Sequence, residues 1–152
     1  MNPLNRFNIY NSFVKMEQKK WPKLYWLIDV HNTIINGTYK KDMDNVKLYP
    51  YAGEVLRRLT DMDDMVLILW TSSYPEYVAD FREWLDKEFS IRIDYFNENP
   101  ECQNTETADL SKKFYYDILL DDKAGFDAEE DWWAVLNELL RVENHKSCGK
   151  LI

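Results

Sequence analysis

Three continuous apolar runs constrain the fold of this chain more than any other feature of its sequence. They cover residues 24–29 (LYWLID), 65–70 (MVLILW) and 117–122 (DILLDD). Runs of this length and composition are typical of strands buried on both faces of a parallel sheet. A further run, 91–96 (IRIDYF), is interpreted as a strand as well. We therefore predict four strands.

Segments with helical periodicity alternate with these runs. We predict helices that begin at Pro50, cover 75–89 and cover 129–142, each with apolar residues on one face. Strands alternating with helices imply βαβ units. The predicted fold class is therefore α/β, a three-layer, Rossmann-like parallel sheet with helices on both faces. Between Thr33 and Tyr49, the pair Asn36-Gly37 predicts a small β-hairpin flap, and 97–110 is expected to be a loop with a short helical piece.

The chain of 152 residues has the length of a single domain. We expect residues 23–143 to form that domain. Residues 1–22 are expected to be an N-terminal extension, either with a short helix over 7–19 or loosely attached, and residues 144–152 to be a flexible tail.

Charge and cysteine content narrow the classes of function. The net charge of −8 disfavours binding to a nucleic-acid backbone. Cys102 and Cys148 show no pairing pattern, and the N-terminal residues lack the apolar core of a signal peptide, so we expect a cytoplasmic protein with reduced thiols. No run is long enough to span a membrane. The oligomeric state is left open, a homo-oligomer included.

Polar residues follow three of the predicted strands. They are Asp29 with His31, Thr71 with Ser72 and Ser73, and Asp121 with Asp122. Ligand sites of parallel sheets lie beyond the carboxyl ends of the strands, so these side chains are expected to meet there. Carboxylates packed together need a compensating cation, and an oxygen-only ligand set suits Mg²⁺.

These residue types suit phosphoryl transfer. Asp29 can attack phosphorus as a nucleophile, while Thr71 donates a hydrogen bond to the phosphoryl oxygens. Lys112 or Lys113 can supply a cation, with Lys113 favoured by its spacing. His31 lies two residues after Asp29 and can act as a general acid and base near neutral pH.

The same residues resemble the four motifs of the haloacid dehalogenase superfamily, in the right order. The resemblance is carried by Asp29-Val30-His31-Asn32-Thr33, by LILWT at 67–71, by Lys113 and by ILLDD at 118–122. It implies that Asp29 is the nucleophile and a Mg²⁺ ligand, together with the backbone carbonyl of His31. It implies that Thr71 and Lys113 hold the phosphoryl oxygens, and that Asp121 or Asp122 completes the metal site. The implied activity is that of a Mg²⁺-dependent phosphatase acting on a phosphorylated substrate.

One departure from the family pattern qualifies this expectation. His31 stands where the family has an aspartate as general acid and base. It is either a working substitute or the mark of a weakened or inactive module that binds phosphate or nucleotide; an interaction protein that reuses the fold is a third alternative. The connections between the motifs are also too short for an inserted cap domain, so we expect a capless member with an open site. The sequence does not identify the substrate.

Overall fold

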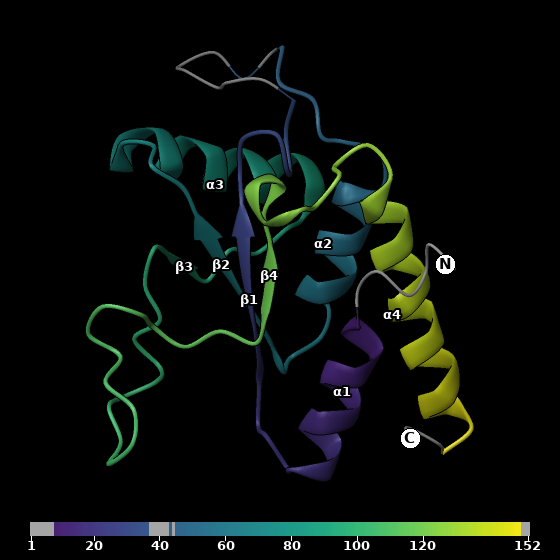
Figure 1. The fold of residues 1–152 in the computed structure, drawn as a ribbon. Helices are drawn as coiled ribbons and strands as arrows, with labels where there is room; N and C mark the ends of the chain where they lie inside the picture. Colours follow the sequence, from purple (N-terminus) through teal and green to yellow (C-terminus); the bar gives the residue numbers. More distant parts are fainter. Residues whose placement is uncertain (1–7, 37–42, 44, 150–152) are drawn as a thin grey trace.

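The computed structural model of the chain describes residues 8–36, 43 and 45–149, and Figure 1 shows its ribbon. The elements, in chain order, are α1 (Ile9–Gln18), β1 (Leu24–Asp29), α2 (Ala52–Thr60), β2 (Met65–Trp70), α3 (Pro75–Phe89), β3 (Tyr95–Phe96), β4 (Ile118–Leu120), the 3-10 turn η2 (Asp122–Ala124) and α4 (Asp131–Ser147). The predicted α/β class is confirmed.

The four strands form one parallel sheet in the order β3-β2-β1-β4. The apolar runs 24–29 and 65–70 are strands over their whole predicted lengths, and they pair from Leu24 with Met65 to Asp29 with Trp70. On the other side of β1, Ile28 pairs with Leu120 of β4. The last residues of β1, β2 and β4 therefore come together at one edge of the sheet.

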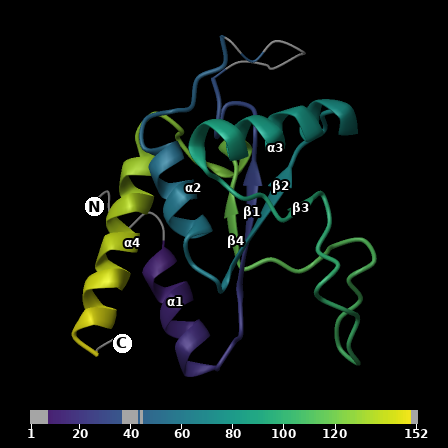
Figure 2. The ribbon, with the colours of Figure 1, turned by 180° about the vertical axis from the view of Figure 1, so that it is seen from behind.

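Side chains of the central strands alternate between two cores. Leu24, Trp26 and Ile28 belong to the main core, which also takes the buried side chains of all four helices. On the opposite face, Leu27 and its neighbours on β2 pack against residues of the long connection after β3, among them Phe114. Figures 1 and 2 show α1, α2 and α4 on one side of the sheet and this connection on the other.

The prediction of helices on both faces is therefore wrong for the described residues, and the strand order explains why. From β1 to β2 to β3 the chain moves in one direction across the sheet, so right-handed crossovers place α2 and α3 on the same face. The return from β3 to β4 passes over the other face, and residues 97–117 contain no helix, not even the short piece expected in 97–110.

The third strand is shorter than the predicted 91–96 because side chains occupy the hydrogen-bonding positions of the ladder. The carboxylate of Asp94 accepts a hydrogen bond from the backbone N–H of Leu67 at 2.9 Å. The guanidinium of Arg92 donates to Asp94 at 2.9 Å and to the carbonyl of Met65 at 2.8 Å. Only Tyr95 and Phe96 pair with β2 as a strand.

The first and last helices, α1 and α4, pack against each other. Of the two alternatives for the N-terminal segment, a short helix or a loosely attached chain, the structure has the helix. This helix, α1, buries Phe13 and its neighbours in the main core. The expectation of a flexible tail after Glu143 is wrong for residues 144–147, since α4 continues to Ser147. Contacts with α1 explain this extension. The ring of His145 packs edge-on against the ring of Tyr10, with the two centroids 5.3 Å apart, and the ammonium group of Lys146 lies over the ring of Phe13.

The tip of the predicted hairpin flap lies outside the described residues. Its base is described and is antiparallel, as Asn36 N–H donates to the Lys47 carbonyl at 3.4 Å and Tyr49 N–H to the Ile34 carbonyl at 2.9 Å. Within the described parts of the connections 30–51 and 71–117, the chain forms no separate cap domain. No helix of the described residues is long and apolar enough to cross a bilayer.

The Asp94 carboxylate predicts a measurable contribution to stability. Replacing it in Asp94→Ala leaves the Leu67 N–H without its acceptor, so we expect a loss of about 1–3 kcal/mol in the free energy of unfolding. Asp94→Asn keeps an acceptor oxygen and should lose less. Urea denaturation of both variants measures this difference; equal losses would contradict the assigned role of the acceptor.

Candidate functional site

A pocket of about 480 Å³ opens at the carboxyl edge of the sheet. The pocket is lined by residues that end, or come shortly after, each of the four predicted strands. The residues that line it are Asp29, His31, Asn32, Trp70, Thr71, Ser72, Asn97, Asp121, Asp122 and Lys123. Of the side chains expected at a site, Ser73, Lys112 and Lys113 do not line the pocket, and the others do.

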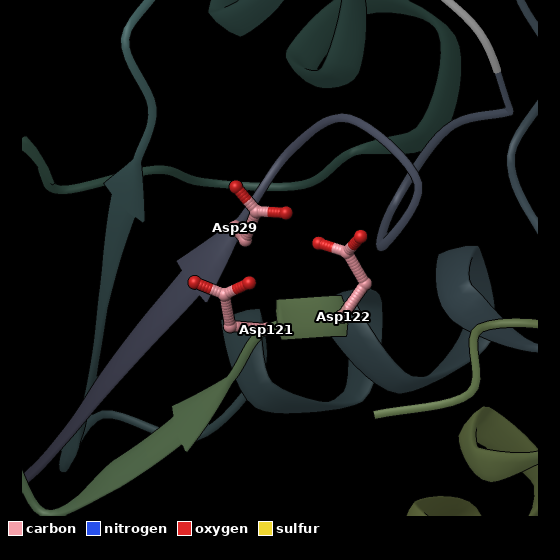
Figure 3. Close-up of side chains that lie close together, drawn as sticks. All are labelled: Asp29, Asp121 and Asp122. Atoms are coloured by element: carbon pink, nitrogen blue, oxygen red, sulfur yellow. The ribbon is translucent and has the colours of Figure 1, made fainter. Parts of the chain in front are cut away.

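Three carboxylates face a common space in this pocket (Figure 3). Asp29 ends β1, Asp121 follows β4, and Asp122 begins η2. One carboxylate oxygen from each residue lies within 4.8 Å of the others. The parallel pairing of β1 with β4 produces this cluster, because the pair Ile28–Leu120 brings the next residue of each strand to the same edge.

Thr33 connects the two halves of the acidic cluster. Its hydroxyl donates to Oδ2 of Asp29 at 2.9 Å and accepts from the backbone N–H of Asp122 at 3.1 Å. The residue is fully buried, and its carbonyl accepts the indole N–H of Trp132 at 2.7 Å. Thr33 is the last residue of the first motif, and this place in the motif was the signal from which a role at the site could have been predicted.

Asn32 makes the turn that returns Thr33 to Asp29. Its backbone has φ of 60°, in the left-handed region that asparagine adopts more readily than most residues. Its N–H donates to the carbonyl of Ile35 at 2.8 Å, while the N–H of Ile34 donates to Val30. The local sequence thus closes a tight loop directly after β1.

The electrostatics of the cluster favour a bound cation. Burial raises the pKa of Asp29 to about 7, and the neighbouring Asp122 and Asp121 add to this effect, although the Thr33 hydroxyl opposes it. Among the described residues, no lysine or arginine forms an ion pair with any of the three carboxylates. An oxygen-only set of close anions without a basic partner is the donor chemistry that Mg²⁺ accepts. Asp29, Asp121 and Asp122 are the residues that could hold it.

Thr71 and Ser72 lie across the pocket from β4, and Asn97 holds the backbone at this point. The side-chain amide of Asn97 accepts from Thr71 N–H at 2.9 Å and donates to the Thr71 carbonyl at 2.6 Å. Sequence reasoning missed Asn97, although it follows the third predicted strand as the other site residues follow theirs. The Thr71 hydroxyl in turn donates to Oγ of Ser73 at 3.1 Å.

His31 is held beside the same loop. Its Nε2 lies 3.0 Å from Oγ of Ser73, at hydrogen-bond distance. The side chain lines the pocket together with Asp29. The structure thus brings the expected acid–base residue into the site, in contact with the loop that follows β2.

The pocket contains a different lysine from the predicted one. Lys113 is exposed and lines a neighbouring hollow, which among the described residues shares only Trp70 with the pocket. Lys123 lines the pocket itself, and its backbone N–H donates to Oδ1 of Asp121 at 2.9 Å. Sequence reasoning missed it, although a lysine directly after the paired aspartates was the available signal.

Comparison with known proteins adds no relative: no family model, curated protein or solved structure matches this chain.

The acidic cluster predicts that Asp29→Asn stabilises the metal-free protein. Because the folded state raises the pKa of Asp29 from 3.8 to about 7, ionisation of this group costs stability as the pH rises through that interval. We expect the variant to gain about 1 kcal/mol at pH 8 after solvent screening, and less at pH 5. That gain corresponds to a rise of about 2–4 °C in Tm.

Thermal unfolding in EDTA at both pH values measures this effect. Asp63→Asn is the matched control, since Asp63 is exposed and lies outside the cluster, and it should change Tm little at either pH. A lower Tm for Asp29→Asn than for the wild type at pH 8 would contradict the repulsion inferred here.

Proposed function

We propose that this protein is a Mg²⁺-dependent phosphohydrolase, a capless member of the haloacid dehalogenase superfamily that cleaves phosphomonoesters through an aspartyl-phosphate on Asp29. One observation carries the proposal. The carboxylates of Asp29, Asp121 and Asp122 meet within 4.8 Å in a pocket that also contains Thr71 and Lys123. Acidic side chains that could hold a cation thus lie in the same pocket as a hydroxyl and an ammonium group that suit phosphoryl oxygens.

In this proposal, Asp29 attacks the phosphorus atom. A bond forms between its carboxylate oxygen and phosphorus, and the bond from phosphorus to the ester oxygen breaks. Mg²⁺ held by Asp29 with Asp121 or Asp122, and by the backbone carbonyl of His31 as the resemblance implies, would neutralise charge on the phosphoryl oxygens.

The loop after β2 binds the transferred group. The hydroxyls of Thr71 and Ser72 donate to phosphoryl oxygens, and Asn97 keeps the backbone of Thr71 in position for this contact. Lys123 is the cation that we place on these oxygens, because it lines the pocket. The resemblance assigns that role to Lys113, which lines the adjoining hollow instead.

His31 moves the protons in both halves of the reaction. Its protonated imidazole gives a proton to the departing ester oxygen, either directly from Nε2 or through Oγ of Ser73. The neutral ring then takes a proton from the water that attacks the aspartyl-phosphate. This second step releases inorganic phosphate and restores the carboxylate of Asp29.

A panel of phosphomonoesters tests the proposal directly. We expect hydrolysis in the presence of Mg²⁺, loss of hydrolysis in EDTA, and a decrease of more than about 1,000-fold in kcat for Asp29→Asn, because the nucleophile is removed. Release of inorganic phosphate is the measurement, and Asp63→Asn is again the control. A wild-type protein that is inert on every ester with Mg²⁺ would overturn the proposal.

The contact between His31 and Ser73 favours a second candidate function, a phosphate- or nucleotide-binding module without turnover. At 3.0 Å from Oγ of Ser73, Nε2 already has a hydrogen-bond partner in the loop, and this bond must be exchanged before the ring can donate a proton directly to a leaving group. A structural role for His31 would leave the site able to bind phosphate but unable to protonate a leaving group.

Substitution of His31 separates the two candidates. If His31 moves protons, we expect His31→Gln to lower kcat by about 100-fold or more, and His31→Asp to lower kcat and change the pH profile. If His31 is structural, His31→Asp instead creates or raises activity, because it restores the acid–base of the family pattern. Steady-state rates between pH 5 and pH 9 distinguish these results.

A further inference from the structure

A second hollow, of about 230 Å³, adjoins the candidate site. Leu27 of β1 and Leu119 of β4 form its apolar floor, and Trp70 and Phe114 contribute aromatic rings. Lys112 and Lys113 also line it. Trp70 lines both this hollow and the pocket that contains Asp29, so one side chain borders both spaces.

The hollow lies on the same face of the sheet as the carboxylate of Asp29. Successive side chains of a strand alternate between faces, so Leu27 and Asp29 of β1 share one face. Asp29 pairs with Trp70 across β1 and β2, which makes the indole the cross-strand neighbour of the proposed nucleophile. On this face of the sheet, Trp70 is therefore the residue that lies beside Asp29 and also lines the hollow.

Trp70 is open to a ligand although it is a large aromatic residue. It is 42% exposed, whereas the residue before it, Leu69, is completely buried. Its ring meets that of Phe114 edge-on, with centroids 5.7 Å apart. The two rings are not stacked on each other, since their planes meet at 65°, and the exposed part of the indole is a surface on which a flat ring can pack.

The chain that carries Phe114 is held at several points, so the hollow exists without a ligand. The side-chain amide of Asn99 donates to the carbonyl of Tyr115 at 2.8 Å, and the carboxylate of Asp117 accepts from Tyr25 N–H at 2.8 Å. Because these bonds connect the segment to β1 and to the residues after β3, a ligand would find the wall already in place.

The charge of the hollow differs from that of the whole chain. The net charge of the protein is −8, yet among the residues that the structure describes, the hollow is lined by two lysines and no carboxylate. Charge complementarity therefore favours a ligand with an anionic group at this end.

From these observations we propose that the hollow binds the leaving group of the substrate, and that this group carries a flat aromatic or heteroaromatic ring and an anionic substituent. The ring stacks on Trp70, and the substituent pairs with Lys112 and Lys113. The proposal rests on the phosphohydrolase function proposed above and names its substrate class.

Matched phosphomonoesters test the ring and the anion separately. Benzyl and cyclohexylmethyl phosphate have similar leaving oxygens but differ in flatness, and 4-carboxybenzyl phosphate adds an anion without conjugation to that oxygen. We expect the wild type to prefer benzyl over cyclohexylmethyl phosphate by about threefold to tenfold in kcat/KM. The carboxylate should raise kcat/KM by a further factor of about three.

The ratios of kcat/KM in variants show which residues cause these two preferences. Trp70→Leu should bring the ratio of benzyl to cyclohexylmethyl phosphate close to one, and Lys112→Ala should reduce the advantage of the carboxylate. Tyr74→Leu is the control, since Tyr74 is 70% exposed and lines neither space, and it should leave both ratios unchanged. A wild type that hydrolyses these esters without preference would overturn this inference and leave the proposed function standing.

A binding measurement distinguishes failure of the proposed phosphohydrolase function from failure of the inference about the hollow. If no ester is hydrolysed, the proposed function fails, and the affinities of benzylphosphonate and ethylphosphonate, measured by calorimetry, decide for the hollow alone. Equal affinities would overturn the inference; tighter binding of benzylphosphonate that Trp70→Leu abolishes would support it. A wild-type dimer that Trp70→Leu dissociates would place a second copy of the chain on the hollow and would also overturn it.

Discussion

The hydroxyl of Thr33 is the contact on which the rest of the site depends. It donates to Asp29 at the end of β1 and accepts from the backbone of Asp122 after β4, while the carbonyl of the same residue receives the indole N–H of Trp132 in α4. One buried residue thus joins two strand ends and a helix. Because a buried hydroxyl must keep its partners, these three elements cannot move apart without a cost in free energy.

The acidic cluster that Thr33 organises works against the stability of the fold. Burial raises the pKa of Asp29 to about 7, with further contributions from Asp122 and Asp121, so an ionised carboxylate at this position is unfavourable without a cation. Groups whose pKa values are displaced in this way cluster at functional sites, where binding or catalysis requires them although they lower the stability of the fold. The proposed function would use this arrangement to bind a cation and an anionic substrate.

The uneven covering of the sheet follows from strand order, which local sequence does not reveal. The runs 24–29 and 65–70 and the helix 75–89 could be predicted with their boundaries, because apolar run length and periodicity depend on neighbours in the chain. Residues 91–94 could not, since the side chains of Arg92 and Asp94 occupy the ladder there. Because β1, β2 and β3 follow one another in the same direction across the sheet, the helices pack on one face. The aromatic-rich connection between β3 and β4 packs on the other face.

The sequence alone determined that Asp29 and Asp121 would lie at the same edge of the sheet, because the carboxyl ends of parallel strands share one edge. The pairing of β1 with β4 in the folded chain decided that their carboxylates come within 4.8 Å of each other. The sequence did not determine which lysine joins them: spacing favoured Lys113, and the structure places Lys123 in the pocket. Nor could it show the two hydrogen bonds of Asn97 to the Thr71 backbone. Strand ends are set by local patterns of apolar residues, whereas the position of a loop side chain depends on contacts between residues far apart in the chain, and these exist only once the chain has folded.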